Sequence, residues 1–351
     1  MASRVGVDVG GVPVGGGAPV VVQSMTNTRT DDVESTLGQI RALVTAGAGL
    51  VRVAVPDSAA AEAMGELVAG SPVPLIADVH FDHTLAVAAI RRGAAGVRIN
   101  PGNIGGSENV REVVEAALER GAVIRVGVNS GSLQRDLREQ EERDPAGALA
   151  ESALRHCALL EGFGFRAIKV SAKSSSPLVT IAANRILAER LPYPLHLGVT
   201  EAGTRWAGSI RSAVALGVLL AEGIGDTIRV SLTGDPVEEV RVALEILRTL
   251  ELAPRGPRVI SCPTCGRTRI DLEPLALEVE RRLEAAGLDL EVAVMGCAVN
   301  GPGEARKADF GIAGGEGEGV VFAQGRPVKK APQSELVDAL FAEIAARHPS
   351  T

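Results

Sequence analysis

The sequence is poor in the residues on which several classes of protein depend. Only 2% of its 351 residues are aromatic, and its four cysteines are too few to cross-link a chain of this length. No apolar run approaches the roughly 18 residues of a membrane span, and the first residues lack the apolar core of a signal peptide. We therefore expect a cytoplasmic protein that does not cross a membrane.

Basic residues are not in excess either. The 36 Lys and Arg residues against 43 Asp and Glu residues give a formal net charge of −7. General affinity for nucleic acid comes mostly from basic side chains that neutralise phosphates, so we expect no nucleic-acid partner. The chain is longer than a single hydrophobic core usually supports, and two domains are the default expectation.

Short apolar segments alternate with amphipathic helical segments over the first 250 residues. We predict eight strands at residues 20–25, 50–56, 75–80, 96–101, 123–129, 167–173, 195–200 and 227–232. Eight such units predict an α/β fold, a TIM (β/α)₈ barrel over residues 1–252, with its last helix at 236–250. A Rossmann-like fold is the alternative, but no G-x-G-x-x-G turn follows the first strand.

The composition changes after the last predicted helix. Residues 251–258, ELAPRGPR, contain two prolines and a glycine, which is typical of a domain boundary. For residues 258–351 we predict a small α+β domain, in which 308–325 forms two strands across a Gly/Glu turn.

Five of the predicted strands carry a basic residue inside an apolar run. These residues are Arg52, Arg98, Arg125, Lys169 and Arg229. Side chains two positions apart lie on the same face of a strand, so polar residues nearer the strand ends should share that face. They are Asn100, Asn129, Lys173 and Ser231. If the face points inward, the set converges on the carboxyl-terminal mouth of the barrel, where active sites of such barrels lie.

Buried cations need anionic partners, and few are available. Only Asp78 and Glu201 stand out as acids at strand ends, so the surplus of cations favours a polyanionic ligand such as a diphosphate. The glycine-rich segment 100–109 supports this interpretation weakly, as a helix start that could bind phosphate. His80 is expected to be a further phosphate donor. A divalent-metal site is the alternative, formed by Asp78, His80, Asp82 and His83.

Three of the four cysteines lie in the second predicted domain. Cys262, Cys265 and Cys297 lack the second Cys pair that usually completes a structural zinc site, although zinc stays possible. Three thiolates with an exchangeable fourth ligand suit a catalytic [4Fe–4S] cluster, and Glu304 is the nearest candidate for that ligand. Cys157 lies on the apolar stripe of a predicted helix, where we expect a core residue.

Long consecutive motifs add a specific resemblance. They are GGGAPVVVQSMTNTRTDD (15–32), ADVHFD (77–82), RINPGNIG (98–105), RVGVNSGSL (125–133), KVSAKSS (169–175), LHLGVTEAG (195–203), IRVSLTGDP (228–236), SCPTCGR (261–267) and MGCAVNGPGEA (295–305). With these motifs, nearly the whole chain resembles the 4-hydroxy-3-methylbut-2-en-1-yl diphosphate synthase family of the non-mevalonate isoprenoid pathway, in its bacterial two-domain form.

The resemblance implies an iron–sulfur oxidoreductase. Such an enzyme uses two electrons to open and dehydrate 2-C-methyl-D-erythritol 2,4-cyclodiphosphate, giving 4-hydroxy-3-methylbut-2-enyl diphosphate. The implied ligands of a [4Fe–4S] cluster are Cys262, Cys265, Cys297 and Glu304. The implied substrate contacts are Arg52, His80, Arg98, Arg125, Asn129, Lys173, Arg229 and Ser231. Glu201 matches the family's barrel carboxylate, with an acid/base role toward the departing hydroxyl, and Glu304 is expected to be displaced by the substrate.

The family also implies ferredoxin or flavodoxin as the electron donor. A docking patch for such an acidic partner could comprise Arg306, Lys307, Arg326, Lys329 and Lys330. The last barrel helix should end at the face opposite the mouth, so a cluster domain that starts there cannot easily reach its own mouth. We therefore predict a head-to-tail homodimer in which each cluster covers the partner's barrel.

Two readings from other classes stay open. A non-catalytic, zinc-stabilised protein that binds a phosphorylated metabolite would explain the cations but not the missing fourth thiolate. A barrel aldolase or phosphatase would place the chemistry on Lys169, Lys173 or the Asp78/His80 pair.

Overall fold

The computed structural model describes residues 3–348, apart from residues 101, 255 and 298–307. The chain divides into two units, Met1–Ala253 and Pro254–Thr351, and each is described by itself below. No helix in the described parts is long and apolar enough to cross a membrane.

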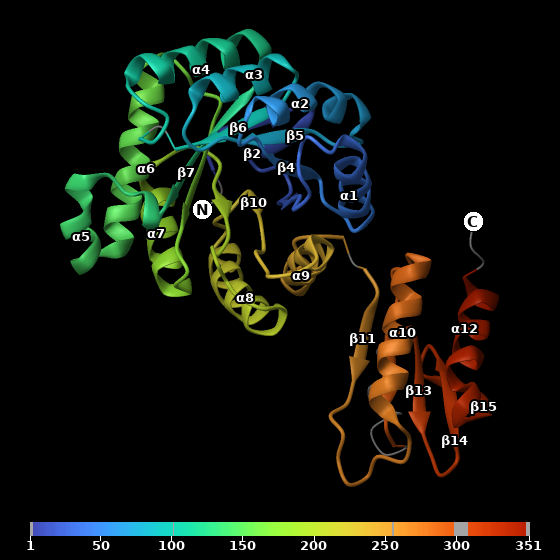
Figure 1. Ribbon diagram of the computed structural model, residues 1–351. Coiled ribbons are helices and arrows are strands. Elements are labelled where there is room, and N and C mark those ends of the chain that lie inside the picture. Colours follow the sequence, from blue (N-terminus) through green and yellow to red (C-terminus); the bar gives the residue numbers. More distant parts are fainter. Residues whose placement is uncertain (1–2, 101, 255, 298–307, 349–351) are drawn as a thin grey trace. The chain divides into compact units, whose positions relative to one another are not determined.

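The first unit is a ring of eight parallel strands enclosed by helices (Figure 1). Its strands are β3 (Val21–Met25), β4 (Leu50–Ala54), β5 (Leu75–Asp78), β6 (Gly96–Ile99), β7 (Val123–Asn129), β8 (Ile168–Lys173), β9 (His196–Leu197) and β10 (Thr227–Ile228). The strand order is β8-β7-β6-β5-β4-β3-β10-β9, and a parallel bridge between Val170 and Leu195 joins its two ends. The predicted TIM barrel is confirmed.

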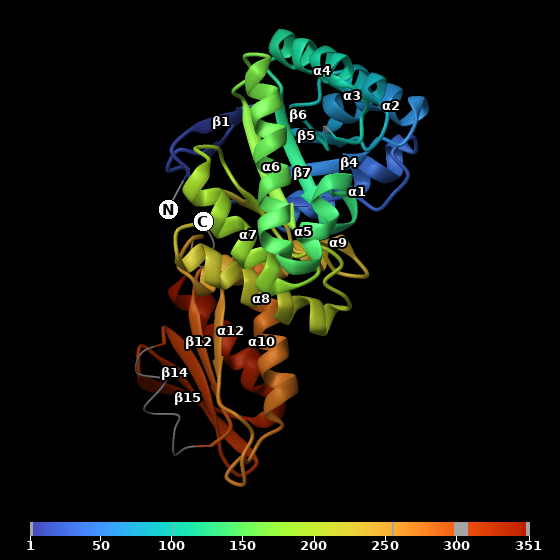
Figure 2. The ribbon, with the colours of Figure 1, turned by 90° about the vertical axis from the view of Figure 1, so that its left-hand side faces the viewer.

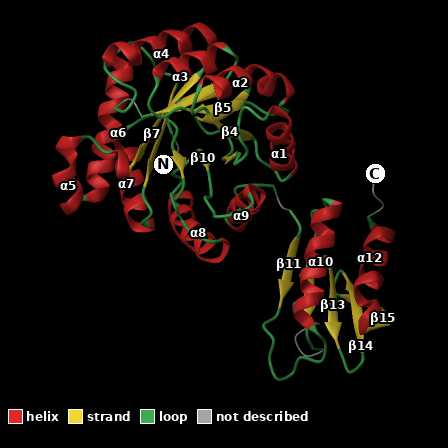
Figure 3. Cartoon of the chain, in the orientation of Figure 1, coloured by secondary structure: helices red, strands yellow, loops and turns green. Residues whose placement is uncertain are grey.

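Helices follow the strands around the outside of the ring, as Figure 3 shows in red. They are α1 (Val33–Thr45), α2 (Ser58–Gly70), α3 (His83–Arg91), α4 (Ser107–Arg120), α6 (Pro145–Gly162), α7 (Pro177–Arg190), α8 (Arg205–Ala221) and α9 (Pro236–Thr249). Two 3₁₀ turns, η1 (Ser130–Ser132) and η2 (Arg135–Leu137), and a short helix, α5 (Arg138–Arg143), lie between β7 and α6. The strands read as continuous apolar runs because both faces of each strand are buried.

Aspartate caps fix the starts of several barrel helices. The carboxylates of five such residues accept hydrogen bonds from backbone N–H groups of the first turn: Asp32, Asp57, Asp82, Asp144 and Asp235. Each cap satisfies a donor that would otherwise lack a partner, and its negative charge suits the positive end of the helix dipole. These helices begin at the mouth, so the caps also order the loops that surround it.

A hairpin that the sequence analysis did not predict closes the other end of the barrel. Its strands β1 (Gly6–Val9) and β2 (Val12–Gly15) are joined by Gly10 and Gly11, whose φ angles of 62° and 93° suit a two-residue hairpin turn. Valines of the hairpin pack against residues at the amino-terminal ends of barrel strands, Leu50 and Val123 among them. The hairpin thereby covers the amino-terminal ends of these strands.

In its described residues, the second unit is a five-stranded sheet with two helices (Figure 2). Its elements are β11 (Arg258–Ser261), α10 (Leu272–Ala286), β12 (Glu291–Met295), β13 (Phe310–Gly314), β14 (Glu318–Ala323), β15 (Arg326–Pro332), η3 (Gln333–Glu335) and α12 (Leu336–Arg347). β11, β12 and β13 are parallel, and β14 and β15 continue the sheet as antiparallel strands. Both helices join one apolar cluster with the sheet, through Leu283 of α10 and Leu340 of α12.

Candidate functional site

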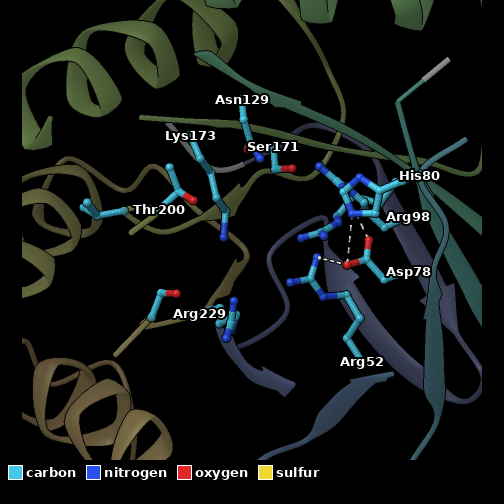
Figure 4. A pocket seen from close by; sticks show the side chains of 12 residues that line it. Arg52, Asp78, His80, Arg98, Asn129, Ser171, Lys173, Thr200 and Arg229 are labelled. Carbon is cyan, nitrogen blue, oxygen red and sulfur yellow. Dashed lines mark hydrogen bonds and ion pairs between the residues drawn. The ribbon is translucent and has the colours of Figure 1, made fainter. Parts of the chain in front are cut away.

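A pocket opens at the carboxyl-terminal mouth of the barrel (Figure 4). It is lined by Arg52, Asp78, His80, Arg98, Arg125, Asn129, Ser171, Lys173, Val199, Thr200, Arg229 and Ser231. All eight residues predicted to contact substrate are in this set, so the structure brings them together from six strands and the segments that follow them.

Strand register explains this convergence. Asp78, Arg98, Arg125 and Lys169 are paired in turn across β5, β6, β7 and β8, so they form one row around the inside of the ring. Asn129 and Lys173 form a second row, nearer the mouth. Two-residue periodicity therefore places the cations and the polar residues above them on the inner face.

Two inward-facing glycines make room for the long cations. A Cβ at Gly127 would collide with the guanidinium of Arg98, and one at Gly198 would collide with the carbonyl oxygen of Arg229 and the ammonium of Lys173. A side chain at either position would displace a cation from the pocket.

Asp78 balances the charge on one side of the pocket. Its carboxylate lies 3.4 Å from Nη1 of Arg52 and 3.2 Å from Nη1 of Arg98, and its side chain is 7% exposed. Nη1 of Arg98 also lies 2.8 Å from Nε2 of His80. Burial acts to raise the pKa of Asp78, but the charge of Arg52 and the contact with His80 outweigh it and hold that pKa well below its usual value.

Glu239, which the sequence analysis missed, balances the charge of Arg229 on the other side of the pocket. Nη2 of Arg229 lies 3.2 and 3.1 Å from its two carboxylate oxygens, and the N–H of Leu232 donates to Oε1 at 2.9 Å. Glu239 lies on α9 rather than on a strand, so strand parity could not find it. A signal was present, because Glu239 falls on the buried stripe that this helix forms with Val240, Ala243 and Leu247.

Glu201 does not take the pairing role that the sequence suggested. It is exposed, it is not among the residues that line the pocket, and its φ of 52° lies in the left-handed region. It directly follows Thr200, which does line the pocket. A non-glycine residue in this conformation is strained, and such strain is frequent at functional sites.

Several guanidinium N–H groups in the pocket have no acceptor. Within the described chain, Nε of Arg52, Nε and Nη1 of Arg125, and Nε of Arg229 are buried without a hydrogen-bond partner. Burial lowers the pKa of Arg52 to about 10, and burial followed by the charges of neighbouring arginines lowers the pKa of Lys173. Five cationic side chains thus face two carboxylates, Asp78 and Glu239. Buried donors without acceptors indicate a site built for an anion.

The divalent-metal alternative at Asp78 and His80 fits this environment poorly. Both oxygens of Asp78 face guanidinium groups, and the surrounding positive charge would repel a dication. His83 instead lies near Glu112 and Asp82, outside the pocket. No group of three potential ligands close enough to hold a metal is found among the residues described.

Lys169 lies deeper in the barrel than the pocket. It is 1% exposed, and its ammonium lies 3.4 Å from Oε1 of Gln23. It does not line the pocket, so a barrel chemistry that uses this lysine as a nucleophile has no access for substrate.

Two cysteines of the second unit follow the ends of two neighbouring parallel strands. Cys262 follows β11 and Cys297 lies two residues beyond β12, and these strands are hydrogen-bonded neighbours. The N–H of Gly296 donates to Sγ of Cys262 at 3.3 Å. These two thiols therefore lie at the same edge of the sheet.

A turn brings Cys265 to the same edge. The N–H of Arg269 donates to the carbonyl oxygen of Gly296 at 2.9 Å, which ties the turn beyond Cys265 to the strand end before Cys297. A hydrogen bond from the backbone of Arg267 lowers the pKa of Cys265, which favours the thiolate form that binds iron. In kind, the three thiols suit an iron–sulfur cluster, but in the described structure they do not lie close enough together to hold a metal. Glu304 lies outside the described residues.

Cys157 is separate from this group. It is 1% exposed on α6, and burial raises the pKa of its thiol to about 12. Its predicted place in the barrel core is confirmed.

Fold and site together define a TIM-barrel protein with a cation-lined pocket at the barrel mouth and a second, cysteine-bearing domain. The family model described as the GcpE TIM-barrel domain matches residues 4–244, and that of the GcpE protein C-terminal domain matches residues 258–346. The chain therefore belongs to the GcpE family.

Curated relatives agree over nearly the whole chain. The chain is 56% identical over 338 residues to a protein of Geobacter sulfurreducens, with 96% of each chain covered. It is 53% identical over 338 residues to one of Aquifex aeolicus, covering 96% of this chain and 95% of that protein. Both are named 4-hydroxy-3-methylbut-2-en-1-yl diphosphate synthase (flavodoxin).

Solved structures of two dehydratases are similar to part of this chain. A 3-dehydroquinate dehydratase of Geobacillus kaustophilus superimposes with a TM-score of 0.51 at 17% identity, covering 71% of this chain and 99% of that one. A type I 3-dehydroquinate dehydratase of Clostridium difficile gives a TM-score of 0.51 at 12% identity, covering 70% of this chain and 97% of that one. At these identities the likeness shows the barrel fold and carries no functional argument.

Proposed function

We propose that this chain is a flavodoxin-dependent 4-hydroxy-3-methylbut-2-en-1-yl diphosphate synthase. It opens 2-C-methyl-D-erythritol 2,4-cyclodiphosphate with two electrons, and one hydroxyl leaves as water. The observation that carries the proposal is the pocket at the barrel mouth, where cations exceed carboxylates and where buried guanidinium N–H groups have no acceptor among the described residues. A ligand with two linked phosphates offers more acceptor oxygens, spread over a greater length, than a single phosphate, and so suits cations that come from several strands.

The pocket would serve both binding and catalysis. Arg52, Arg125 and Arg229 each offer a buried N–H to the diphosphate, and Lys173 adds a point charge. When the ring C–O bond breaks, negative charge grows on a diphosphate that these residues already surround. Donors that are in place before the reaction stabilise that charge without reorganisation.

Cys262, Cys265 and Cys297 would hold a [4Fe–4S] cluster, with Glu304 as the exchangeable fourth ligand. When bound, the cluster supplies the two electrons one at a time. The donor set supports this assignment, since three thiols that share one sheet edge suit iron–sulfur ligation. We also propose Glu201 as the acid/base group for the departing hydroxyl: it directly follows Thr200 of the pocket, although its own side chain is exposed and outside the pocket lining.

Flavodoxin is the donor named in the curated relatives. The proposed basic docking patch is only partly described, because Arg306 and Lys307 lie outside the described residues. Lys330 is paired with Glu318 at 3.2 Å. Its strand, β15, is four strands away from β11, or roughly 19 Å at the usual strand spacing. Docking at Arg326 and Lys329 therefore stays a prediction. The distance between their strand and β11, the strand that precedes Cys262, does not favour it.

We also propose a head-to-tail homodimer in which each cluster domain covers the partner's barrel. An exposed apolar stripe supports association with another copy: Trp206, Ile210 and Val214 lie at successive turns of α8 and are 80%, 47% and 48% exposed. Mixing Cys297→Ala chains with Glu201→Gln chains should restore activity, since one of the two composite sites is then intact. If confirmed mixed dimers showed no activity, that result would contradict sites shared between the two chains.

Anaerobic turnover tests the function. Cluster-loaded protein with reduced flavodoxin should convert the cyclodiphosphate to 4-hydroxy-3-methylbut-2-enyl diphosphate, detected by mass spectrometry. Arg125→Met should reduce kcat/KM by a factor of about 100 or more, because it removes two buried N–H donors. Arg111→Met is the matched control, as Arg111 is a surface residue paired with Glu108 on α4. Absence of product from loaded wild-type protein would contradict the proposal.

A further inference from the structure

The two carboxylates that pair with the pocket cations differ in position. Asp78 lines the pocket, whereas Glu239 lies behind Arg229 and does not line it. Glu239 is buried, with 4% of its surface exposed. In the described structure its contacts are with Arg229 and with the backbone of Leu232. A buried carboxylate with these contacts requires an explanation, because burying its charge is costly.

We propose that Glu239 is a positioning residue that fixes the guanidinium of Arg229 and the backbone beside Ser231 for the diphosphate. The inference rests on the proposed function. Glu239 itself touches no substrate in this scheme, so it is not a catalytic residue.

The contacts divide the guanidinium of Arg229 into two parts. Nη2 faces both oxygens of Glu239, at 3.2 and 3.1 Å, while Nε is buried and has no acceptor within the described chain. An internal carboxylate therefore holds one edge of the group and leaves another donor for the ligand. Figure 4 shows Arg229 at the cavity, where a bound ligand could accept from the donor that Glu239 does not hold.

A second hydrogen bond ties Glu239 to the chain that carries Ser231. Oε1 accepts from the N–H of Leu232 at 2.9 Å, and Leu232 directly follows Ser231. The carboxylate of Glu239 thus holds two parts of the pocket in place. It contacts the side chain of Arg229 directly, and it holds Ser231 through the backbone N–H of the next residue, Leu232. Loss of Glu239 would loosen both.

Helix α9 holds Glu239 itself in place. The helix begins with Pro236, and the carboxylate of Asp235 accepts a hydrogen bond from the N–H of Val237 at 2.9 Å. Glu239 lies in the first turn, where the helix dipole favours a negative charge. Val240 and Ala243 bury the same face against the barrel. A carboxylate on a capped, packed helix is a more rigid support than one on a loop.

Substitution of Glu239 by Gln tests the proposal. Gln keeps the size and can still accept from Leu232, but it loses the charge that holds Arg229. We expect the Kd of the cyclodiphosphate, measured by calorimetry on full-length protein, to rise roughly tenfold, the effect of one charged hydrogen bond. Glu238→Gln is the matched control, because in the described part of the chain Glu238 pairs with two surface arginines, Arg205 and Arg241. The Kd of this variant for the cyclodiphosphate should equal that of wild type.

A double-mutant cycle separates positioning from general stability. In an Arg229→Met background, Glu239→Gln should change the Kd less than twofold, because the group it positions is gone. Full additivity of the two substitutions, or an unchanged Kd in folded Glu239→Gln protein, would overturn the proposal. If Glu239→Gln fails to fold, Glu239→Asp keeps the charge one methylene farther back, and an unchanged Kd in that variant would equally overturn it.

Inorganic pyrophosphate serves as a second probe. If wild-type protein binds pyrophosphate but not the cyclodiphosphate, the proposed function fails while the same variants still test Glu239. We expect Glu239→Gln to weaken pyrophosphate binding by a similar factor. An equal affinity of wild type and variant for pyrophosphate would overturn the positioning role whichever substrate the enzyme uses.

Discussion

Removal of Asp78 leaves two pocket guanidinium groups without the carboxylate that pairs with them. Its carboxylate lies 3.4 Å from Arg52 and 3.2 Å from Arg98, and all three side chains are 10% exposed or less. Asp78→Asn keeps the shape but leaves these guanidinium groups, with Arg125 nearby, facing one another without an anion. Breaking a buried ion pair costs about 3 to 5 kcal/mol. For a domain of this size that corresponds to a fall in Tm of roughly 6 to 20 °C.

Thermal unfolding of the full chain at pH 7, followed by circular dichroism, measures this effect. Asp57→Asn is the matched control, because Asp57 caps α2 through an exposed carboxylate and Asn caps equally well. Saturating pyrophosphate should raise the Tm of Asp78→Asn more than that of wild type, since the anion supplies the missing charge.

The pH dependence gives a second check with a definite sign. The folded-state pKa of Asp78 lies below its unfolded value of about 3.9, so its ion pairs contribute fully above that pH. The contribution is lost as the pH falls toward the folded-state pKa. The difference in stability between wild type and Asp78→Asn should therefore shrink below about pH 4. A difference under about 1 kcal/mol at pH 7, or one that grows on acidification, would refute the reasoning.

Three further predictions concern other parts of the chain. Glu201→Gln should bind the cyclodiphosphate with wild-type Kd but reduce kcat by a factor of about 100 or more, and unchanged turnover would remove Glu201 from the scheme. In cluster-free protein at pH 8, iodoacetamide should label Cys265 first and leave Cys157 unlabelled until denaturation, as peptide mass spectrometry would show. Val9→Ala should lower the free energy of unfolding by about 1 to 3 kcal/mol, measured by urea titration, because Val9 is fully buried where the β1–β2 hairpin packs against the barrel. An unchanged free energy of unfolding would show that this packing does not stabilise the protein.

The barrel and most of its pocket could be predicted from sequence because both depend on simple periodicities. Strands buried on both faces produce apolar runs, and a basic residue inside such a run has few places to point except the barrel interior. Arg98 and Arg125 illustrate this, since each interrupts an apolar strand and each lines the pocket. Once one inward residue per strand is identified, two-residue alternation gives the others, such as Asn129 above Arg125.

Partners that come from other elements could not be predicted in this way. Glu239 reaches Arg229 from a helix, and only packing of α9 against the barrel brings the two together. Glu201 was expected to pair with a cation because it ends a strand, but a left-handed backbone places it outside the pocket lining. β9 and β10 are two residues each, shorter than the predicted strands at 195–200 and 227–232.

The metal content of anaerobically purified protein, with its visible absorption before and after dithionite, tests the central claim most directly. The account predicts about four iron and four sulfide per chain, with a brown colour that bleaches on reduction. It also predicts that substitution of Cys297 by Ala abolishes this cluster, whereas substitution of the buried Cys157 by Ala retains it. Stoichiometric zinc without sulfide after anaerobic reconstitution would contradict the account and favour a zinc-stabilised protein that only binds its phosphorylated ligand.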